Sequence, residues 1–309
     1  MSRDVEPSAG PLSFMLANWY SGATLLALIA ARHSQIECNG ETLPFGPRDD
    51  RRYDCTCGKY LDTCDFFRFA AEHMWSESKN DWNRALFCQV PDLSDYGALN
   101  RLLRSGRSFA TGLRSVARIA PSIRQREQEF VRAHIAFFDR AAAFSGRSHY
   151  LDGTKSLRRT QLFLENTDRE IRVVHLIRDG RAFANSYRKN RHMDLSALPE
   201  AAERWNSYIA NVDRLERQDA RVNVVTVRYE DLCRGPEGFL HEMLGFLEVP
   251  YEPLLERTRS DLHVLGNRMR RNFGNEIRED RSWETELGRR EIVQLEELMG
   301  ESLSRFNYV

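Results

Sequence analysis

The sequence predicts an α/β fold in which a central parallel sheet is flanked by helices and carries a helical insertion. From residue 148 onward, short apolar runs alternate with helical patterns, which is typical of a parallel sheet covered on both faces. Near the N-terminus, the apolar run Leu12–Ala17 passes through a glycine-containing turn into a helical stretch. Between Phe66 and Phe144 the alternation stops and helical patterns dominate, which indicates the insertion.

The N-terminal elements follow from their residue types. Leu12–Ala17 is apolar enough for a buried strand, and Ala23–Arg32 consists of good helix formers. Ser34–Asn39 predicts a second short strand, and residues 42–64, rich in Pro, Gly, Asp and Cys, predict an irregular loop. We therefore predict a single domain over residues 1–309, with a loop and mostly helical insertion at about 42–147.

The C-terminal half supplies the rest of the sheet. Residues 171–177 are enriched in β-branched side chains, and Pro236 stands in the first turn of a helical pattern, where proline is favoured. The predicted strands are 148–151, 171–177 and 222–227, and the predicted helices are 157–165, 181–190, 198–217, 236–247 and 289–298.

Composition excludes several classes of protein. Lys+Arg and Asp+Glu both number 45, so the net charge gives no reason to expect a nucleic-acid partner. The apolar stretch 12–31 has no basic segment before it and is broken by Asn18, Ser21 and Gly22, so it is neither a signal peptide nor a membrane span. We expect a cytoplasmic protein without a transmembrane segment, and the sequence does not predict its oligomeric state.

Two segments have the pattern of phosphate-binding sites. Tyr20–Leu26 is a loop entering a helix, where consecutive N–H groups, the helix dipole and a hydroxyl can hold an anion. It is not a Walker loop, because no Lys precedes Thr24. In the second segment Arg178 follows a strand and Ser186 lies two turns into the next helix, so a guanidinium and a hydroxyl can reach one phosphate. The alternatives are an ordinary strand–turn–helix and a surface ion pair between Arg178 and Asp179.

These segments, taken in order, resemble the sulfotransferase family that uses 3′-phosphoadenosine-5′-phosphosulfate (PAPS). Ser21–Leu26 is similar to the family's 5′-phosphosulfate loop, and Arg178 with Ser186 is similar to its 3′-phosphate motif. The resemblance runs from residue 14 to about 270. Its downstream part is similar to the family's in Val227–Leu232, Gly235-Pro236 and Phe246–Pro250. Three further segments fit bacterial-type members: Leu151–Ser156, Gly266–Arg270, and Cys55–Gly58 with Cys64.

The resemblance implies a P-loop-like nucleotide-binding fold and an enzyme that transfers a sulfuryl group to a hydroxyl or amine, leaving adenosine 3′,5′-bisphosphate (PAP). It needs no metal ion. The acceptor would be a small molecule, lipid or carbohydrate, bound beside the loop at 42–64 and the helical insertion. The residues implied in donor binding are Tyr20, Ser21, Gly22, Ala23, Thr24, Leu25, Arg178, Ser186, Tyr229, Gly266, Asn267 and Arg270.

The resemblance also implies catalytic residues. Glu41 matches the position of the catalytic base in some family members, with His33 and His175 as substitutes. Family members commonly carry Lys or Arg where this chain has Tyr20, whose hydroxyl brings a hydrogen bond but no positive charge. We expect Lys155, which follows a strand beside the loop, to supply that charge, although a surface lysine is the alternative.

Other functions remain open at this point. A P-loop-type kinase or other NTPase shares the strand–loop–helix pattern, and Asp152 is its nearest candidate magnesium ligand. A non-catalytic nucleotide-binding protein on the same fold would explain the missing cation at Tyr20.

Cysteines and arginines raise two further questions. Cys38, Cys55, Cys57 and Cys64 could supply four thiolates for zinc, but Cys-x-Cys is tighter than the usual spacing, so a reduced cluster or a local disulfide is the favoured interpretation. The arginines of residues 101–126 predict a solvated helix face, with peripheral membrane contact as the alternative.

Overall fold

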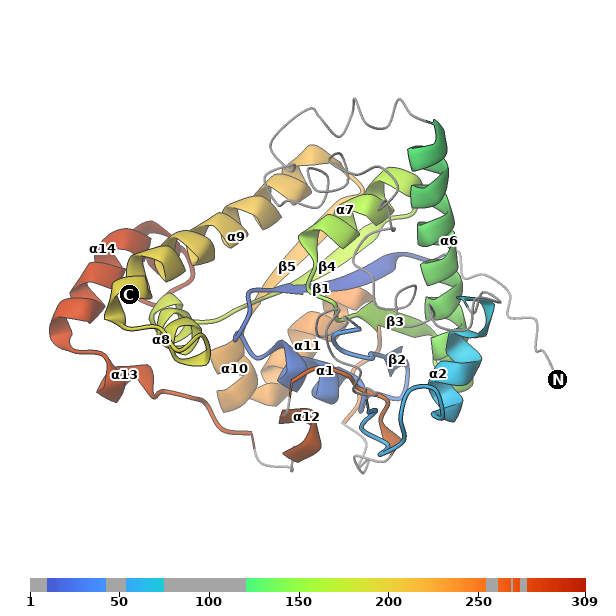
Figure 1. The fold of residues 1–309 in the computed structure, drawn as a ribbon, viewed down its shortest axis with the longest axis horizontal. Helices are drawn as coiled ribbons and strands as arrows, with labels where there is room; N and C mark the ends of the chain where they lie inside the picture. The colour runs from blue at the N-terminus through green and yellow to red at the C-terminus, as the bar shows by residue number, and fades with distance from the viewer. Residues whose placement is uncertain (1–9, 43–53, 75–120, 254–260, 268, 273–276) are drawn as a thin grey trace.

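Five parallel strands form the centre of the molecule (Figure 1), in the order β2-β3-β1-β4-β5. The computed structural model describes residues 10–42, 54–74, 121–253, 261–267, 269–272 and 277–309. The strands are β1 (Leu12–Ala17), β2 (Ile36–Glu37), β3 (His149–Asp152), β4 (Ile171–Ile177) and β5 (Val222–Arg228). Within the described ranges all four pairings between these strands are parallel, so the predicted α/β fold with a central parallel sheet is confirmed.

Alternate side chains of β1 belong to two core layers, one on each face of the sheet. Phe14 and Leu16 face one side of the sheet, in a cluster that includes side chains of α2 (Asp65–Ala70), α6 (Pro121–Phe144) and α7 (Leu157–Asn166). Met15 and Ala17 face the other side, in a cluster with α1 (Ala23–Ala30) and α11 (Pro236–Leu247). Successive strand residues point to opposite faces, so β1 is buried on both.

A third apolar cluster lies beyond the sheet, between α8 (Gly180–Asn190), α9 (Leu198–Gln218) and α14 (Arg289–Arg305). Trp205 of α9 is buried there and donates a hydrogen bond from Nε1 to the carbonyl of Arg178, at 3.1 Å. This contact fixes the turn between β4 and α8. The remaining helical segments are η1 (Glu72–Met74), η4 (Leu195–Ala197), α10 (Tyr229–Arg234), α12 (Met269–Asn272) and α13 (Trp283–Glu286).

The inserted region contributes helices within its described part. Phe66 and Phe67 of α2 and Phe137 and Phe138 of α6 are buried in the same cluster as Phe14 of β1. Residues 75–120, which hold most of the predicted arginine-rich surface, lie outside the described residues. Among the helices that are described, none has the length and apolar character needed to cross a membrane.

Candidate functional site

The candidate site lies at the carboxyl edge of the sheet. The parallel neighbours β3, β1 and β4 end at Asp152, Ala17 and Ile177. Parallel strands present their carboxyl ends at one edge, so the turns that follow them converge there. The predicted phosphate loop, Lys155 and Arg178 stand in these three turns.

The turn after β1 depends on Gly22. Its φ of 87° lies in the left-handed region, and a Cβ there would stand 2.4 Å from Cδ2 of Tyr229. Leu26 N donates to the Gly22 carbonyl at 3.1 Å as α1 begins. The N–H groups of the first turn, Ala23 to Leu25, therefore have no intrahelical acceptor and are oriented for an anion.

Ser21 gives this turn an unsatisfied hydroxyl. Ser21 is 1% exposed, and its Oγ finds no hydrogen-bond partner among the described residues. A buried hydroxyl without a partner costs about 1–3 kcal/mol. An oxygen-rich ligand at the α1 N-terminus would satisfy it.

Arg178 is buried and holds the turn after β4 against the phosphate loop. Its Nη1 donates to the Tyr20 carbonyl at 2.9 Å and to Ser186 Oγ at 3.3 Å. The guanidinium also lies 4.9 Å from the centre of the Tyr229 ring. The pair predicted from its spacing of eight residues, Arg178 and Ser186, is thus in direct contact.

Asp280 is the anion that Arg178 holds in this structure. Arg178 Nη2 donates to the Asp280 carbonyl at 2.8 Å and to Oδ2 at 2.9 Å. Although burial favours the neutral acid, hydrogen bonds from Ser282 and Arg178 hold the pKa of Asp280 below its usual value. A planar guanidinium that binds a carboxylate in this way is also suited to a phosphate.

The surface ion pair that was the alternative for Arg178 is wrong. Asp179 caps α8 and pairs with Arg181 at 2.8 Å, while Arg178 is 5% exposed and turns toward the site. Asp280 was missed by the sequence analysis, because nothing in its neighbourhood links it to Arg178.

Glu41 and Lys155, predicted independently as catalytic residues, form an ion pair. Lys155 Nζ lies 3.2 Å from Glu41 Oε2, and their side chains are 11% and 19% exposed. They meet because β2 and β3 are neighbours in the sheet. The backbone that follows β2 packs against the backbone that follows β3. A Cβ on Gly153 would stand 2.8 Å from the Cα and carbonyl oxygen of Gly40.

Lys155 is held in an uncommon conformation. Its φ of 61° is left-handed, which is rare for a residue with a side chain and costs of order 1–3 kcal/mol. Its carbonyl accepts a hydrogen bond from the Tyr208 hydroxyl at 3.3 Å. Such strain persists where surrounding contacts enforce it, and it is frequent at functional sites.

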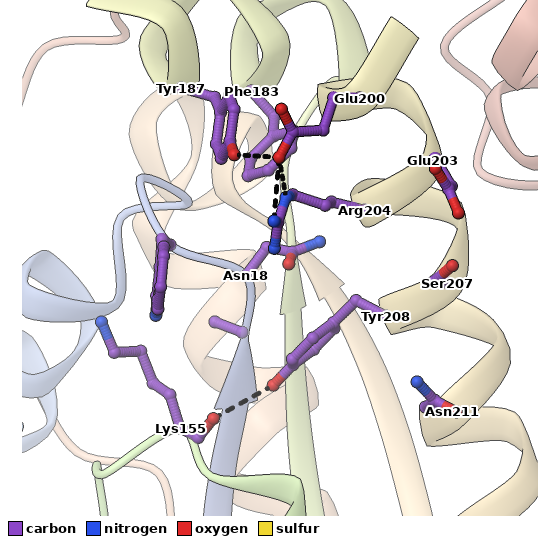
Figure 2. A pocket seen from close by; sticks show the side chains of 12 residues that line it. Asn18, Lys155, Phe183, Tyr187, Glu200, Glu203, Arg204, Ser207, Tyr208 and Asn211 are labelled. Atoms are coloured by element: carbon purple, nitrogen blue, oxygen red, sulfur yellow. Dashed lines mark hydrogen bonds and ion pairs between the residues drawn. The ribbon is translucent and has the colours of Figure 1, made fainter. Parts of the chain in front are cut away.

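A pocket of ≈ 480 Å³ opens beside Lys155 (Figure 2). In Figure 2, Lys155 stands on the wall opposite Glu203, Ser207 and Asn211 of α9. At one end, Glu200 accepts hydrogen bonds from Tyr187 and Arg204, each at 2.9 Å. The complete lining is Ala17, Asn18, Trp19, Lys155, Phe183, Tyr187, Glu200, Glu203, Arg204, Ser207, Tyr208 and Asn211.

Tyr20 and Tyr229 occupy different positions around the loop. The Tyr20 side chain packs against the cluster of α8, α9 and α14, and its carbonyl is the group that contacts Arg178. Tyr229 lies under Gly22 and donates from its hydroxyl to the Arg278 carbonyl at 3.3 Å. Burial raises the pKa of Tyr229, so its hydroxyl stays a neutral donor.

Of the predicted residues near 266–270, Gly266 is the one that lies against the phosphate loop. A Cβ on Gly266 would stand 3.1 Å from Thr24 Oγ1, so this segment closes over the start of α1. Asn267 is exposed and accepts a hydrogen bond from Met269 N at 2.9 Å. The buried Arg270 donates to the Gly266 carbonyl at 2.8 Å and to Asp54 Oδ1 at 2.9 Å, which braces the segment.

Three other candidate residues are buried inside the fold. Asp152, considered as a magnesium ligand, is 1% exposed and pairs with Arg159 at 2.7 Å. His33 uses both ring nitrogens, with Gln35 N and the Pro250 carbonyl each at 3.1 Å. His175 is buried in β4, which lowers its pKa to about 4. Neither histidine fits the role of a substitute base.

The cysteine cluster differs from its prediction in membership. The described cysteines, which exclude Cys88, are all free thiols, so the local disulfide is not formed. Cys38 is not part of the group formed by the other three cysteines; it follows β2 directly and is buried. His263 takes its place beside Cys55, Cys57 and Cys64. No sequence signal joined this histidine to cysteines some 199 residues away.

Comparisons with known proteins show which family and fold this chain resembles. Residues 163–253, which include β4, Arg178, Ser186 and Tyr229, match the model of the sulfotransferase family. The sulfotransferase domain of the olefin synthase of Synechococcus PCC 7002 has a similar fold, with TM-score 0.50 and 18% identity over 97% of this chain and 98% of that one. The sulfotransferase domain of the curacin biosynthetic pathway aligns with TM-score 0.50 and 17% identity over 96% and 99% of the two chains. No curated protein matches.

The fold is therefore that of a sulfotransferase domain, and the turns that hold the predicted phosphate loop, Lys155 and Arg178 lie at the carboxyl edge of its sheet. Residues 163–253 are similar to the sulfotransferase family in sequence, and the chain resembles sulfotransferase domains in fold.

Proposed function

We propose that the protein transfers a sulfuryl group from PAPS to a hydroxyl or amine of a small-molecule, lipid or carbohydrate acceptor and releases PAP. The observation that carries this proposal is the convergence of two anion-binding turns on one sheet edge. One is the α1 N-terminus with the unsatisfied Ser21 hydroxyl, and the other is Arg178 with Ser186. Because PAPS carries phosphate at both ends of its ribose, it needs two such sites.

Each of the two turns would bind one end of the donor. The N–H groups of Gly22 to Leu25 and the Ser21 hydroxyl are suited to the 5′-phosphosulfate. Arg178 and Ser186 are suited to the 3′-phosphate, which would replace the Asp280 carboxylate on the guanidinium. Tyr229, packed between Gly22 and Arg178, would contact the nucleoside that joins the two phosphates.

The Glu41–Lys155 pair supplies the catalytic groups. The acceptor oxygen or nitrogen attacks sulfur, the bond from sulfur to the 5′-phosphate oxygen breaks, and the acceptor proton passes to Glu41. Lys155 meets the negative charge that develops on the leaving oxygen, in place of the cation that Tyr20 does not provide. As Lys155 turns from Glu41 to the donor, it frees the carboxylate to act as the base. This step needs no metal ion.

The pocket beside Lys155 is the candidate acceptor site. It adjoins the turn after β1, and Lys155 belongs both to its wall and to the ion pair with Glu41. Glu203, Ser207 and Asn211 give it polar groups that would orient a hydroxyl or amine. Ser207→Trp should fill it and abolish turnover while PAP affinity stays unchanged. If this variant turns over normally, the acceptor binds elsewhere.

Ligand selectivity tests the donor assignment. Thermal unfolding should be compared without ligand, with PAP, and with ATP and Mg²⁺. We expect stabilisation by PAP that does not require Mg²⁺, because binding to the native state raises Tm. Stabilisation by ATP alone would contradict the proposal and favour a kinase or NTPase. Binding of PAP with no sulfuryl transfer to any acceptor would favour a non-catalytic nucleotide-binding protein.

A further inference from the structure

Four potential metal ligands gather outside the proposed reaction centre. They are the thiols of Cys55, Cys57 and Cys64 and Nδ1 of His263, and these atoms all lie within 4.8 Å of one another. The Cys57 and Cys64 sulfurs are 3.6 Å apart. His263 Nδ1 lies 3.5 Å from the Cys55 sulfur and 3.5 Å from the Cys64 sulfur.

These three distances match edges of a zinc tetrahedron, and the 4.8 Å limit holds all four ligand atoms close to one centre. With Zn–S bonds of about 2.3 Å and Zn–N bonds of about 2.0–2.1 Å, tetrahedral angles place two sulfurs about 3.8 Å apart and sulfur and nitrogen about 3.6 Å apart. A disulfide would instead require sulfurs about 2.05 Å apart. The arrangement is therefore that of ligands around a common centre.

The surroundings suit a closed, structural metal site. Cys55 is 2% exposed and Cys64 is 0% exposed, while Cys57 is partly buried. The His263 ring stacks on Phe66, with centroids 4.5 Å apart and planes inclined by 12°, and Phe144 meets it edge-on at 6.0 Å. These rings hold the plane of the imidazole while Nδ1 stays toward the sulfurs.

We propose that Cys55, Cys57, Cys64 and His263 bind one structural Zn²⁺ through three thiolates and Nδ1. Three sulfur ligands with one imidazole favour zinc over the harder cations, which prefer oxygen ligands. Binding deprotonates the three thiols, so three protons pass to solvent and no redox change occurs. With four protein ligands the site has no open position, and its role is to hold the fold together.

The metal would join two segments that are distant in the sequence. The Thr56 hydroxyl donates to the Leu262 carbonyl at 2.5 Å and accepts from Val264 N at 2.9 Å, so residues 54–64 already contact residues 262–264. Leu265 follows directly: its N donates to the Asn39 carbonyl at 2.8 Å, and its carbonyl accepts from Glu41 N at 3.2 Å. The zinc site therefore supports the wall that positions Glu41, although its existence does not depend on the proposed function.

Metal content tests the proposal directly. The full-length protein should be produced with zinc, purified under reducing conditions and measured by mass spectrometry for bound metal. We expect one zinc ion per chain in the wild type and in Cys233→Ser, a control that removes a free thiol outside the cluster. Cys64→Ser and His263→Ala should lose the ion. Wild-type protein without bound zinc, or full retention of zinc in both ligand variants, would overturn the proposal.

Cobalt substitution keeps the proposal testable if the ligand variants do not fold. Wild-type protein stripped of metal by a chelator and given Co²⁺ should develop the visible d–d bands and sulfur-to-metal charge-transfer bands of a tetrahedral thiolate site. Stripping should also lower Tm by roughly 5 °C or more, reversed by added Zn²⁺. Octahedral Co²⁺ spectra, or a Tm unaffected by stripping, would contradict a structural tetrahedral site.

Discussion

Arg178 offers the sharpest test of how the donor is bound. In Arg178→Gln the guanidinium that contacts Ser186 Oγ at 3.3 Å and an anionic oxygen of Asp280 at 2.9 Å is lost. A hydrogen bond to a charged group contributes roughly 1.5–3 kcal/mol, so the affinity for PAP should fall about 10- to 150-fold. The affinity for adenosine 5′-monophosphate, which lacks the 3′-phosphate, should fall much less.

Calorimetric titration of both ligands measures this difference. Arg188→Gln is the matched control, because Arg188 stands on the same helix but pairs with Asn185 at 2.9 Å. Tm must be followed in parallel, since Arg178 also binds the Tyr20 carbonyl. Equal losses for PAP and the 5′-monophosphate, or no loss for either, would refute the assignment of Arg178 to the 3′-phosphate.

Four other outcomes follow from the same geometry. Asp280→Asn should tighten PAP binding roughly two- to fivefold, because it removes a negative charge that competes for the guanidinium; weaker binding in a titration would contradict this. Glu41→Gln should lower turnover about 10²- to 10⁴-fold while PAP affinity is unchanged, and normal initial rates would leave the base unassigned. Gly22→Ala should cost about 1–3 kcal/mol of stability, measured by denaturant unfolding, because φ is 87° and the added Cβ would stand 2.4 Å from Cδ2 of Tyr229. A variant as stable as the wild type would contradict this. Burial lowers the pKa of His175 from 6.5 to about 4, so between these pH values the unfolded chain binds a proton that the folded chain does not. The free energy of unfolding should therefore fall by up to about 3 kcal/mol as the pH drops from 6.5 to 4. In His175→Phe this fall should be smaller, and identical stability–pH profiles of the two proteins would exclude the effect.

Residue patterns were sufficient for the elements with strong local signals. The β-branched run 171–177 forms β4 with the predicted bounds, and Pro236 begins α11 as expected. Tertiary contacts moved the bounds of other elements away from the predicted ones. The final helix was predicted to end at residue 298, but α14 continues to Arg305 because Met299 and Leu303 are buried against α8 and α9, which outweighs Gly300 within the helix.

Short elements were less predictable. The second strand was expected over residues 34–39, but β2 is limited to Ile36–Glu37, because Asn39 pairs with Leu265 instead of β3. The six-residue helix α10 was missed because it begins directly after β5, without a turn signal to separate them. Periodicity does not identify elements of this length.

The candidate site was predictable where its residues follow strands. Glu41 and Lys155 were named separately, and the parallel pairing of β2 with β3 explains why they meet. Asp280 and His263 lie far along the chain from their partners, in segments without regular structure at those positions. Contacts of that kind are created by the fold, and spacing along the sequence carries no sign of them.

Transfer of a radiolabelled sulfuryl group from PAPS is the decisive assay for the proposed activity. The full chain should be incubated with ³⁵S-labelled PAPS and a panel of alcohols, phenols, sugars and amines, with Glu41→Gln as the paired control. We expect labelled acceptor and an equal amount of PAP with the wild-type protein, and a strongly reduced yield with the variant. Failure of the wild-type protein to transfer label to any acceptor, with PAP still bound, would contradict a catalytic role.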